Sequence, residues 1–183
     1  MYITLVRHAE TFSNEDGRMV GFNNVKLSRK GVTNALFLKD KIRNEKYDIC
    51  YMSPLARCVE TAMILVGDRV LTKPDNRLNE RDIGDFKGKS IKKYDKKKFW
   101  EYNLNSNDSN VERVQDVFKR CEEFLDEIKK EDKDVLIVSH EAVIRCMHYL
   151  LNNKDLNGDL LDIDIPNCYI EKIEVVKWTM SNI

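Results

Sequence analysis

The chain has 183 residues, of which 42% are hydrophobic and 34% are charged, and 31 basic residues balance 31 acidic ones. A chain of this size and composition can bury its own core, which excludes a disordered protein and favours one domain over residues 1–183. Its balanced charge gives no electrostatic reason to expect nucleic acid or an anionic membrane as a partner.

The five cysteines are odd in number and lack the paired spacings of zinc sites or redox motifs, so we expect reduced core thiols. No segment is apolar over a membrane-spanning length, and the first residues lack the basic leader and cleavage site of a secretory signal. We therefore expect a cytoplasmic protein, and a homodimer is left open.

The first quarter of the chain predicts two strands with a helix between them. Residues 2–6 and 48–52 are short apolar runs typical of buried strands. Ser28 is a suitable N-cap, and apolar residues at helical spacing after it predict a helix that extends to about residue 45.

The next segment begins with a second helix signal. Ser53 and Pro54 are typical of an N-cap followed by proline at the first helical position, with an apolar stripe that continues to Val66. Residues 69–72 predict a short third strand. Residues 78–110 show no clear period and carry many charges.

The second half of the chain carries the clearest helix, a strongly amphipathic stretch over residues 111–128. Residues 134–138 predict a buried parallel strand that is followed by another helix. Residues 168–176 predict a last strand at a sheet edge. Alternating strands and helices indicate an α/β three-layer sandwich with a mostly parallel central sheet, where ligands bind at the carboxyl ends of the strands.

Charged or hydrogen-bonding residues follow several of these predicted strands. They include Arg7 and His8, then Arg57 near the start of a helix, Glu80 in a loop, and His140. If the strands are neighbours, these side chains converge. Two histidines, two arginines and a carboxylate suit phosphoryl transfer, because arginine binds phosphate oxygens through its planar fork and histidine can act as the nucleophile.

The segment Arg7-His8-Ala9-Glu10-Thr11 resembles the Arg-His-Gly-Glu-Thr signature of the histidine phosphatase superfamily, which includes cofactor-dependent phosphoglycerate mutase. Other blocks resemble the family in the same order along the chain. They are Leu27-Ser28 with Gly31 and Ala35, Ser53-Pro54-Leu55 with Arg57, Glu60 and Thr61, Leu78 with Glu80, Gly84 and Gly88, Val138-Ser139-His140 with Ile144-Arg145, and finally Asn167. In size and layout the chain is similar to the small α-ribazole-phosphate phosphatases.

The resemblance implies a fold like that of phosphoglycerate mutase, with a cap over the active-site pocket formed by residues from about 84 to 110. It also implies a role for each matching residue. His8 would be the nucleophile that forms a phosphohistidine, Glu80 would protonate the leaving alcohol and then activate water, and His140 would stabilise the phosphoryl group. The residues that would bind phosphoryl oxygens are Arg7, Asn14, Arg57 and Glu141. No metal or other cofactor is expected, because arginines and histidines offset the charge of the phosphate.

Each of these residues also has a structural interpretation. A single histidine after a strand is often only a capping residue, and an arginine on a helix is commonly solvated or ion-paired. Glu80 lies in a charged loop, where a surface residue is the ordinary interpretation. Glu10 or Asp82 could also be confused with it as the catalytic carboxylate. His148 shows no partner in the sequence pattern and is expected to be structural.

The chain departs from the family pattern in three places. Ala9 replaces a glycine, which is a mild change, and residues 107–112 blur the usual Gly-Glu-Ser stretch. Glu141 follows the second histidine where glycine is common, so we expect its side chain to point away while its backbone N–H faces the phosphate at a helix N-terminus. On this hypothesis Glu141→Gly changes activity little.

Seven lysines lie in the segment from Lys87 to Lys98. They form either a basic lid that attracts phosphorylated substrates or a solvated helical face.

The predicted function is a metal-independent phosphomonoesterase that acts on a small phosphorylated metabolite. One alternative is a cofactor-dependent phosphoglycerate mutase, which the compact chain disfavours because mutases carry longer insertions. A second alternative is a catalytically silent module that binds phosphate or a partner. The sequence does not identify the physiological substrate.

Overall fold

The computed structural model describes residues 1–93, 95–102, 110–157 and 159–176. Their strands form one sheet in the order β3-β2-β4-β1-β5. The strands are β1 (Tyr2–Arg7), β2 (Ile49–Met52), β3 (Leu71–Pro74), β4 (Val135–Ser139) and β5 (Ile170–Glu174). All neighbours are parallel except β5, which is antiparallel to β1 at the edge. The predicted mostly parallel sheet and its terminal edge strand are therefore confirmed.

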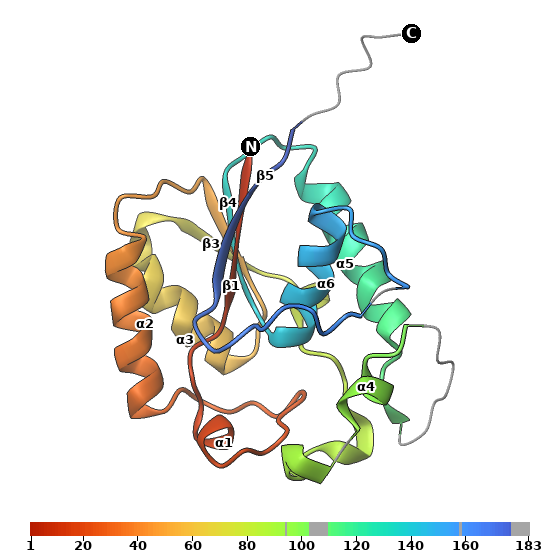
Figure 1. Ribbon diagram of the computed structural model, residues 1–183. Helices are drawn as coiled ribbons and strands as arrows, with labels where there is room; N and C mark the ends of the chain where they lie inside the picture. Colours follow the sequence, from red (N-terminus) through yellow and green to blue (C-terminus); the bar gives the residue numbers. More distant parts are fainter. Residues whose placement is uncertain (94, 103–109, 158, 177–183) are drawn as a thin grey trace, which may run out of the picture.

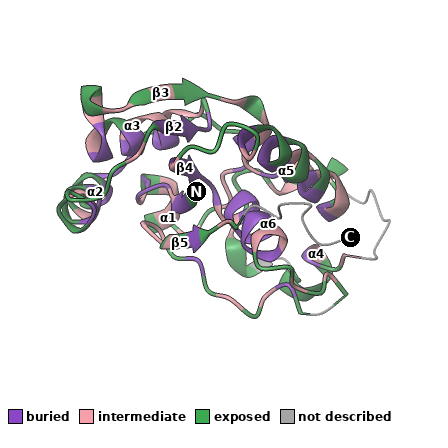
Figure 2. Ribbon diagram, turned by 90° about the horizontal axis from the view of Figure 1, so that it is seen from above, coloured by how far each residue is buried: buried purple, intermediate pink, exposed green. Residues whose placement is uncertain are grey.

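Four helices cover the two faces of the sheet (Figure 1). Helices α2 (Arg29–Lys41) and α3 (Ala56–Leu65) lie on one face, and α5 (Val114–Ile128) and α6 (Glu141–Leu151) lie on the other. Successive strand residues alternate between the layers. Figure 2 shows that each helix turns its buried side toward the sheet. This arrangement confirms the α/β three-layer sandwich.

Alternation along β1 shows how one strand serves two cores. Val6 packs with Leu38 of α2 and Cys58 of α3 in one apolar cluster. Its neighbour Leu5 belongs to the other cluster, together with Phe124 of α5 and many residues of α6. Each of these side chains is almost fully removed from water, and burial of one large apolar side chain stabilises the fold by about 1.5–3 kcal/mol.

The remaining short elements lie mostly near the carboxyl ends of the parallel strands. Figure 1 shows α1 (Phe12–Glu15) and α4 (Lys96–Phe99) at that end of the molecule. The 3-10 turns are Gly67–Arg69, Asn76–Leu78, Gly84–Phe86 and Ile91–Lys93. The expected cap segment thus contains two short turns and α4, while residues 94 and 103–109 lie outside the described residues.

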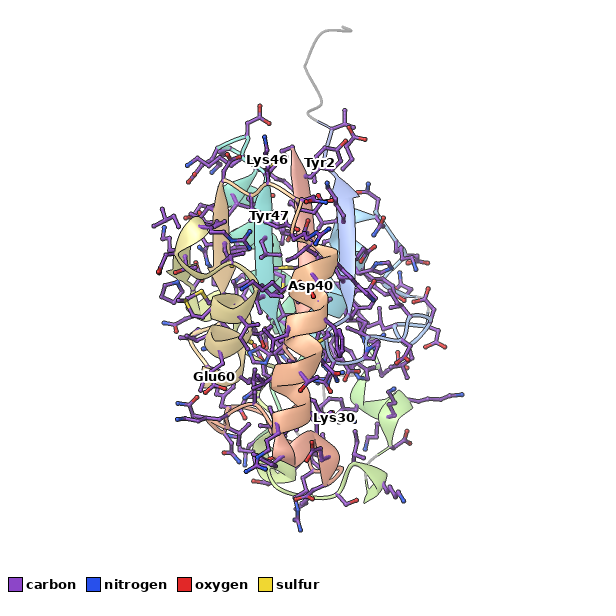
Figure 3. All side chains as sticks on the ribbon, turned by 90° about the vertical axis from the view of Figure 1, so that its left-hand side faces the viewer. Tyr2, Lys30, Asp40, Lys46, Tyr47 and Glu60 are labelled. Carbon is purple, nitrogen blue, oxygen red and sulfur yellow. The ribbon has the colours of Figure 1, made fainter. Side chains whose placement is uncertain are left out.

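Helix α2 begins where the sequence predicted. The Ser28 hydroxyl accepts a hydrogen bond from the Gly31 N–H at 3.0 Å, which confirms the N-cap. A side chain at Gly31 would meet the Glu10 carbonyl, because a Cβ there would lie 2.0 Å from that oxygen. Helix α2 therefore packs directly on the loop after β1, and Figure 3 shows it in front of the sheet with its axis along the strands. The helix ends at Lys41, earlier than the predicted residue 45.

The predicted start of α3 was wrong. The helix begins at Ala56 with Leu55 as its N-cap, not at Pro54 with Ser53 as the cap. Ser53 is still tied to the sheet, since its N–H donates to the Val138 carbonyl at 3.1 Å. Its hydroxyl donates to Asn79 Oδ1 at 2.9 Å. These bonds hold Ser53 at the end of β2, and α3 begins three residues later, at Ala56.

Three other elements have boundaries that differ from the prediction by a few residues. Strand β3 occupies residues 71–74 instead of 69–72, α5 starts at Val114 instead of residue 111, and β5 occupies residues 170–174 instead of 168–176. The cysteines are free, and all are buried except Cys168, which is partly buried. Among the helices of the described residues, none is long and apolar enough to cross a membrane.

Candidate active site

His8 lies immediately after β1 and is held beside β4. Its N–H donates to the Ser139 carbonyl at 2.9 Å, and its side chain is 3% exposed. The ring nitrogen Nδ1 lies 2.7 Å from the Ala9 carbonyl oxygen, a geometry in which Nδ1 carries the proton and donates. The lone pair is then on Nε2. Burial, followed by the charges of Arg57 and Arg7, lowers the pKa of His8 well below its usual value, which keeps the ring neutral.

His140 follows β4 and meets His8 because β4 and β1 are neighbouring parallel strands. Arg7 and Ser139 are paired in the ladder, so the residues that follow them lie side by side. The two ring centroids are 5.2 Å apart. His140 is fully buried, and burial together with the charge of Arg57 lowers its pKa. The convergence of the two histidines therefore results from strand order.

Arg57 connects the two histidines from the first turn of α3. Its Nε lies 3.3 Å from His8 Nε2 and 3.1 Å from His140 Nδ1. Its terminal nitrogens donate to the Asn23 and Gly21 carbonyls at 2.9 and 2.8 Å. Gly21 has φ +53°, and a Cβ there would lie 2.7 Å from Ile83 Cγ1. A glycine is thus required where the backbone bends to hold this arginine.

Arg7 and Asn14 bring further donors to the same place. The Asn14 Oδ1 accepts from the Thr11 N–H at 3.0 Å at the start of α1, which leaves the amide nitrogen available for another acceptor. The NH1 nitrogen of Arg7 donates to the Ile165 carbonyl at 2.5 Å. Its Nε is buried and has no hydrogen-bond partner in the described part of the chain. Both side chains therefore keep donors that an anion could accept.

Glu80 lines the same pocket as these donors. Its Oε1 accepts from the Arg81 N–H at 2.9 Å and from the Ala142 N–H at 3.3 Å. Burial raises the pKa of Glu80 above its usual value, the Arg57 charge opposes this shift, and the Glu141 charge adds to it. A raised pKa suits a general acid, because more of the carboxyl group is protonated near neutral pH.

The two rival carboxylates are engaged elsewhere. Glu10 forms an ion pair with Lys30 at 2.8 Å, and Asp82 forms one with Lys87 at 2.9 Å. Neither of them lines the pocket that contains His8, whereas Glu80 does. The ambiguity among the three carboxylates in the sequence is therefore resolved in position by the fold.

The expectation that the Glu141 side chain points away from the pocket was wrong. Glu141 lines the pocket, and its Oε2 lies 3.3 Å from Arg7 NH1. Its Oε1 lies 3.2 Å from the NH2 nitrogen of Arg145 one turn along α6. A glycine at this position has no side chain that could make these contacts. The effect of Glu141 on the pocket therefore depends on its ion pairs with Arg7 and Arg145.

The pocket is small, with a volume of about 100 Å³. Its walls combine charged groups with apolar side chains from the N-terminal loop and the cap. The lining residues are Arg7, His8, Asn14, Arg18, Met19, Val20, Gly21, Arg57, Glu80, Arg81, Ile83, Ile91, Phe99, Trp100, Glu141 and Ala142. None of these lining residues is a lysine, so in the described part of the cap the lysine run provides no wall of the pocket.

Sequence reasoning missed several lining residues. Arg18 lay in a polar loop with no period, and Arg81 stood in a charged stretch beside Glu80. The structure places the Arg81 guanidinium 4.1 Å from the centre of the Phe99 ring, with Nε donating to the Glu112 carbonyl at 2.7 Å. Of these two arginines, only Arg81 carried a signal in the sequence, because it is adjacent to the proposed acid Glu80.

Two further groups complete the description of titratable residues. His148 does have a partner, since its Nδ1 lies 2.8 Å from the Glu171 carboxylate on β5, far along α6 from the pocket. Within the described residues, no group of three or more His, Cys, Asp or Glu side chains is arranged to hold a metal ion. The pocket itself is lined by four arginines, whose donors suit an anion.

Comparisons with known proteins agree in family and fold. A family model described as the histidine phosphatase superfamily (branch 1) matches residues 3–180. Phosphoserine phosphatase 1 of Hydrogenobacter thermophilus is 30% identical over 164 residues, which are 85% of this chain and 78% of that protein. The adenosylcobalamin/alpha-ribazole phosphatase of Escherichia coli K12 is 28% identical over 153 residues, 79% of this chain and 75% of that protein. The structure of Bacillus stearothermophilus YhfR superposes with a TM-score of 0.85 at 28% identity, over 96% of this chain and 91% of that one.

Proposed function

Because this chain belongs to the histidine phosphatase superfamily (branch 1), we propose that it hydrolyses a small phosphomonoester through a phosphohistidine at His8. The observation that carries the proposal is the position of Arg57. Its Nε lies within 3.3 Å of His8 Nε2 and within 3.1 Å of His140 Nδ1, in a buried setting. A neutral ring nitrogen beside fixed cationic donors suits attack on phosphorus.

In the first step His8 Nε2 attacks the phosphorus atom while the bond from phosphorus to the substrate oxygen breaks. Arg7, Arg57, Asn14 and the N–H of Glu141 hold the phosphoryl oxygens, and His140 faces the group from the other side. Glu80 gives its proton to the departing oxygen, so the product leaves as a neutral alcohol. The raised pKa of Glu80 supports this assignment.

In the second step a water molecule takes the place of the alcohol. Glu80, now ionised, accepts a proton from the water, whose oxygen attacks the phosphorus atom of phosphohistidine. The nitrogen–phosphorus bond breaks, inorganic phosphate is released, and the neutral ring of His8 is restored. The same carboxyl group thus donates a proton in one step and accepts one in the other, so each turnover leaves it unchanged.

We favour hydrolysis of the phosphomonoester over the phosphoglycerate mutase reaction. The match covers 78% of the length of phosphoserine phosphatase 1 of Hydrogenobacter thermophilus. A compact chain has little room for the insertions that would retain a bisphosphate between half-reactions. Size therefore supports the phosphatase over the mutase.

The experiment is a measurement of phosphate release from α-ribazole phosphate, 3-phosphoglycerate, phosphoserine and an aromatic phosphate. The wild type should turn over at least one of them without added metal, and His8→Ala should turn over none. His148→Gln is the matched control, because His148 lies on α6 and pairs with Glu171 instead of lining the pocket. Its turnover should equal that of the wild type.

Other outcomes would point to the alternatives. Phosphate transfer between phosphoglycerates that depends on a bisphosphate primer would establish the mutase. Binding of inorganic phosphate without turnover of any substrate would establish the silent module.

Light scattering of the same preparation tests whether the protein forms a homodimer. The free cysteines support our inference of a reducing compartment such as the cytoplasm.

A further inference from the structure

An arginine of α5 grips the backbone segment that carries Glu80. The NH1 nitrogen of Arg120 donates to the carbonyls of Arg77 and Asn79, at 2.5 and 2.7 Å. Its NH2 nitrogen donates to the carbonyl of Glu80 itself, at 3.3 Å. One guanidinium group therefore bonds three of the four peptide carbonyls from residue 77 to the proposed acid.

Arg120 is in turn held by Glu112. Its Nε lies 2.9 Å from Glu112 Oε1 and its NH2 lies 3.2 Å from Oε2, so both carboxylate oxygens meet the planar guanidinium. The Oε2 atom of Glu112 also accepts from the Asp82 N–H at 3.0 Å, and the Glu112 N–H donates to the Asp82 carbonyl at 2.8 Å. The two side chains, 17% and 19% exposed, thus bind the chain both before and after Glu80.

The sheet supplies separate anchors for the same segment. The Ser139 hydroxyl donates to the Leu78 carbonyl at 2.7 Å, and the Ser53 hydroxyl donates to Asn79 Oδ1 at 2.9 Å. The Leu78 side chain is fully buried in the core. Because none of these contacts involves Arg120, we expect the segment to stay attached to the sheet when Arg120 is replaced.

The position of the Glu80 carboxylate depends on this backbone. Its Oε1 accepts from the adjacent Arg81 N–H at 2.9 Å and from the Ala142 N–H of α6 at 3.3 Å. A shift of the backbone at residues 79–81 would therefore move the carboxylate as well. Misplacement of a reacting group by about 1 Å can cost about a hundredfold in rate.

We propose that Arg120 is a positioning residue, which sets the place where Glu80 meets the leaving oxygen of the substrate. This inference rests on the proposed function, in which Glu80 is the proton donor. Arg120 does not line the pocket, and in the described part of the chain its hydrogen bonds end on residues 77–80 and Glu112. Its loss should therefore impair proton donation by Glu80 and leave the binding of the phosphoryl oxygens unchanged.

The test compares two substrates that differ in their need for a proton. The oxygen of an alkyl phosphate must be protonated as it leaves, whereas nitrophenolate leaves without a proton. Arg120→Met should lower kcat/KM about tenfold or more for an alkyl phosphate that the wild type hydrolyses, and less than about threefold for nitrophenyl phosphate. The inhibition constant of inorganic phosphate should stay within about twofold of the wild-type value, because no phosphate ligand is altered.

Three further variants separate positioning from a general structural role. Arg120→Lys keeps a cation that can bond some of the carbonyls, so it should show a smaller selective loss, and it serves the same comparison if Arg120→Met does not fold. Glu112→Gln breaks the same ion pair but keeps an acceptor for the Asp82 N–H, and it should preserve the wild-type ratio of the two kcat/KM values. Lys119→Gln removes an exposed charge from the neighbouring position of α5 and should change neither substrate.

Two results would overturn the inference alone, provided that Glu80→Gln shows the selective loss on the alkyl phosphate. One is an unchanged ratio of the two kcat/KM values in the Arg120 variants. The other is an equally large change of that ratio in Glu112→Gln, which would assign the effect to the ion pair instead of the carbonyl bonds. If Glu80→Gln shows no selective loss, or the wild type turns over no phosphomonoester, the proposed function fails and this inference fails with it.

Discussion

The Oε2 atom of Glu141 lies 3.3 Å from the NH1 nitrogen of Arg7, so a carboxylate of the chain already engages an arginine of the proposed phosphate site. The other oxygen of Glu141 lies 3.2 Å from Arg145, which is 1% exposed. The pair holds Arg7 by NH1, while its Nε has no hydrogen-bond partner among the residues that the structure describes. Glu141 therefore fixes the arginine while its negative charge opposes a bound phosphate.

Glu141→Gln should bind inorganic phosphate more tightly, because it removes that opposing charge while keeping the length of the side chain. The inhibition constant of phosphate should fall about fivefold, which corresponds to a charge interaction of about 1 kcal/mol in a partly solvated site. Steady-state inhibition by phosphate measures it, with the exposed Glu122→Gln as a control. A weaker affinity for phosphate would instead show that holding Arg7 matters more than the charge.

Glu80→Gln should slow substrates with a poor leaving group far more than those with a good one. Cleavage of an alkyl phosphate should fall about a hundredfold or more, the usual loss when a general acid is removed. The burst of nitrophenolate from nitrophenyl phosphate should change little, since that group leaves without a proton. Rapid mixing measures both, and Asp82→Asn is the control. Equal losses on the two substrates would argue against Glu80 as the acid.

The pH dependence of the cleavage rate should report the titration of Glu80. The acid form of Glu80 is needed in the first step, and it is lost as the pH rises through its raised pKa. The rate of alkyl phosphate cleavage should therefore fall on the alkaline side, and this limb should vanish in Glu80→Gln. An alkaline limb that persists unchanged in the variant would belong to another group.

His8 and His140 should stay neutral at pH values where an exposed histidine is protonated. Burial and the nearby arginines lower both pKa values, so their ring resonances in NMR spectra should not titrate near pH 6.5 in the folded protein. The unfolded chain has the ordinary value of about 6.5 and binds more protons below it. These two residues should thus lower the stability as the pH falls below about 6.5. Titration of His8 at or above 6.5 would contradict this.

Arg145→Met should destabilise the protein, because Arg145 joins α6 to the segment that precedes β5. Its NH1 nitrogen donates to the Leu160 and Ile163 carbonyls at 2.7 and 2.8 Å, and its guanidinium lies 5.1 Å from the Trp100 ring. Loss of these bonds should lower the free energy of unfolding in urea by about 2–3 kcal/mol. Arg113→Gln, which breaks an exposed pair with Asp116, should cost less than about 0.5 kcal/mol.

Local patterns were sufficient for the elements that frame the site. The apolar runs of β1 and β4 are recognisable because both faces of a central parallel strand are buried, so nearly every residue must be apolar. The Ser28 cap was predictable because its hydrogen bond closes within three residues. The ends of β1 and β4 placed Arg7, His8 and His140, and these positions required no knowledge of contacts.

The sequence by itself therefore determined which residues end the strands, and their order along the chain pointed to phosphoryl transfer. Tertiary structure decided what those residues touch. The order β3-β2-β4-β1-β5 sets His140 beside His8. The two strands that carry them are far apart in the sequence, since 132 positions separate Tyr2 of β1 from its hydrogen-bond partner Asp134, just before β4. The contact between Glu141 and Arg7 and the bonds that hold Ser53 in the sheet depend on segments distant in sequence. No local period encodes such contacts, because the strand order and the packing of the cap bring them about.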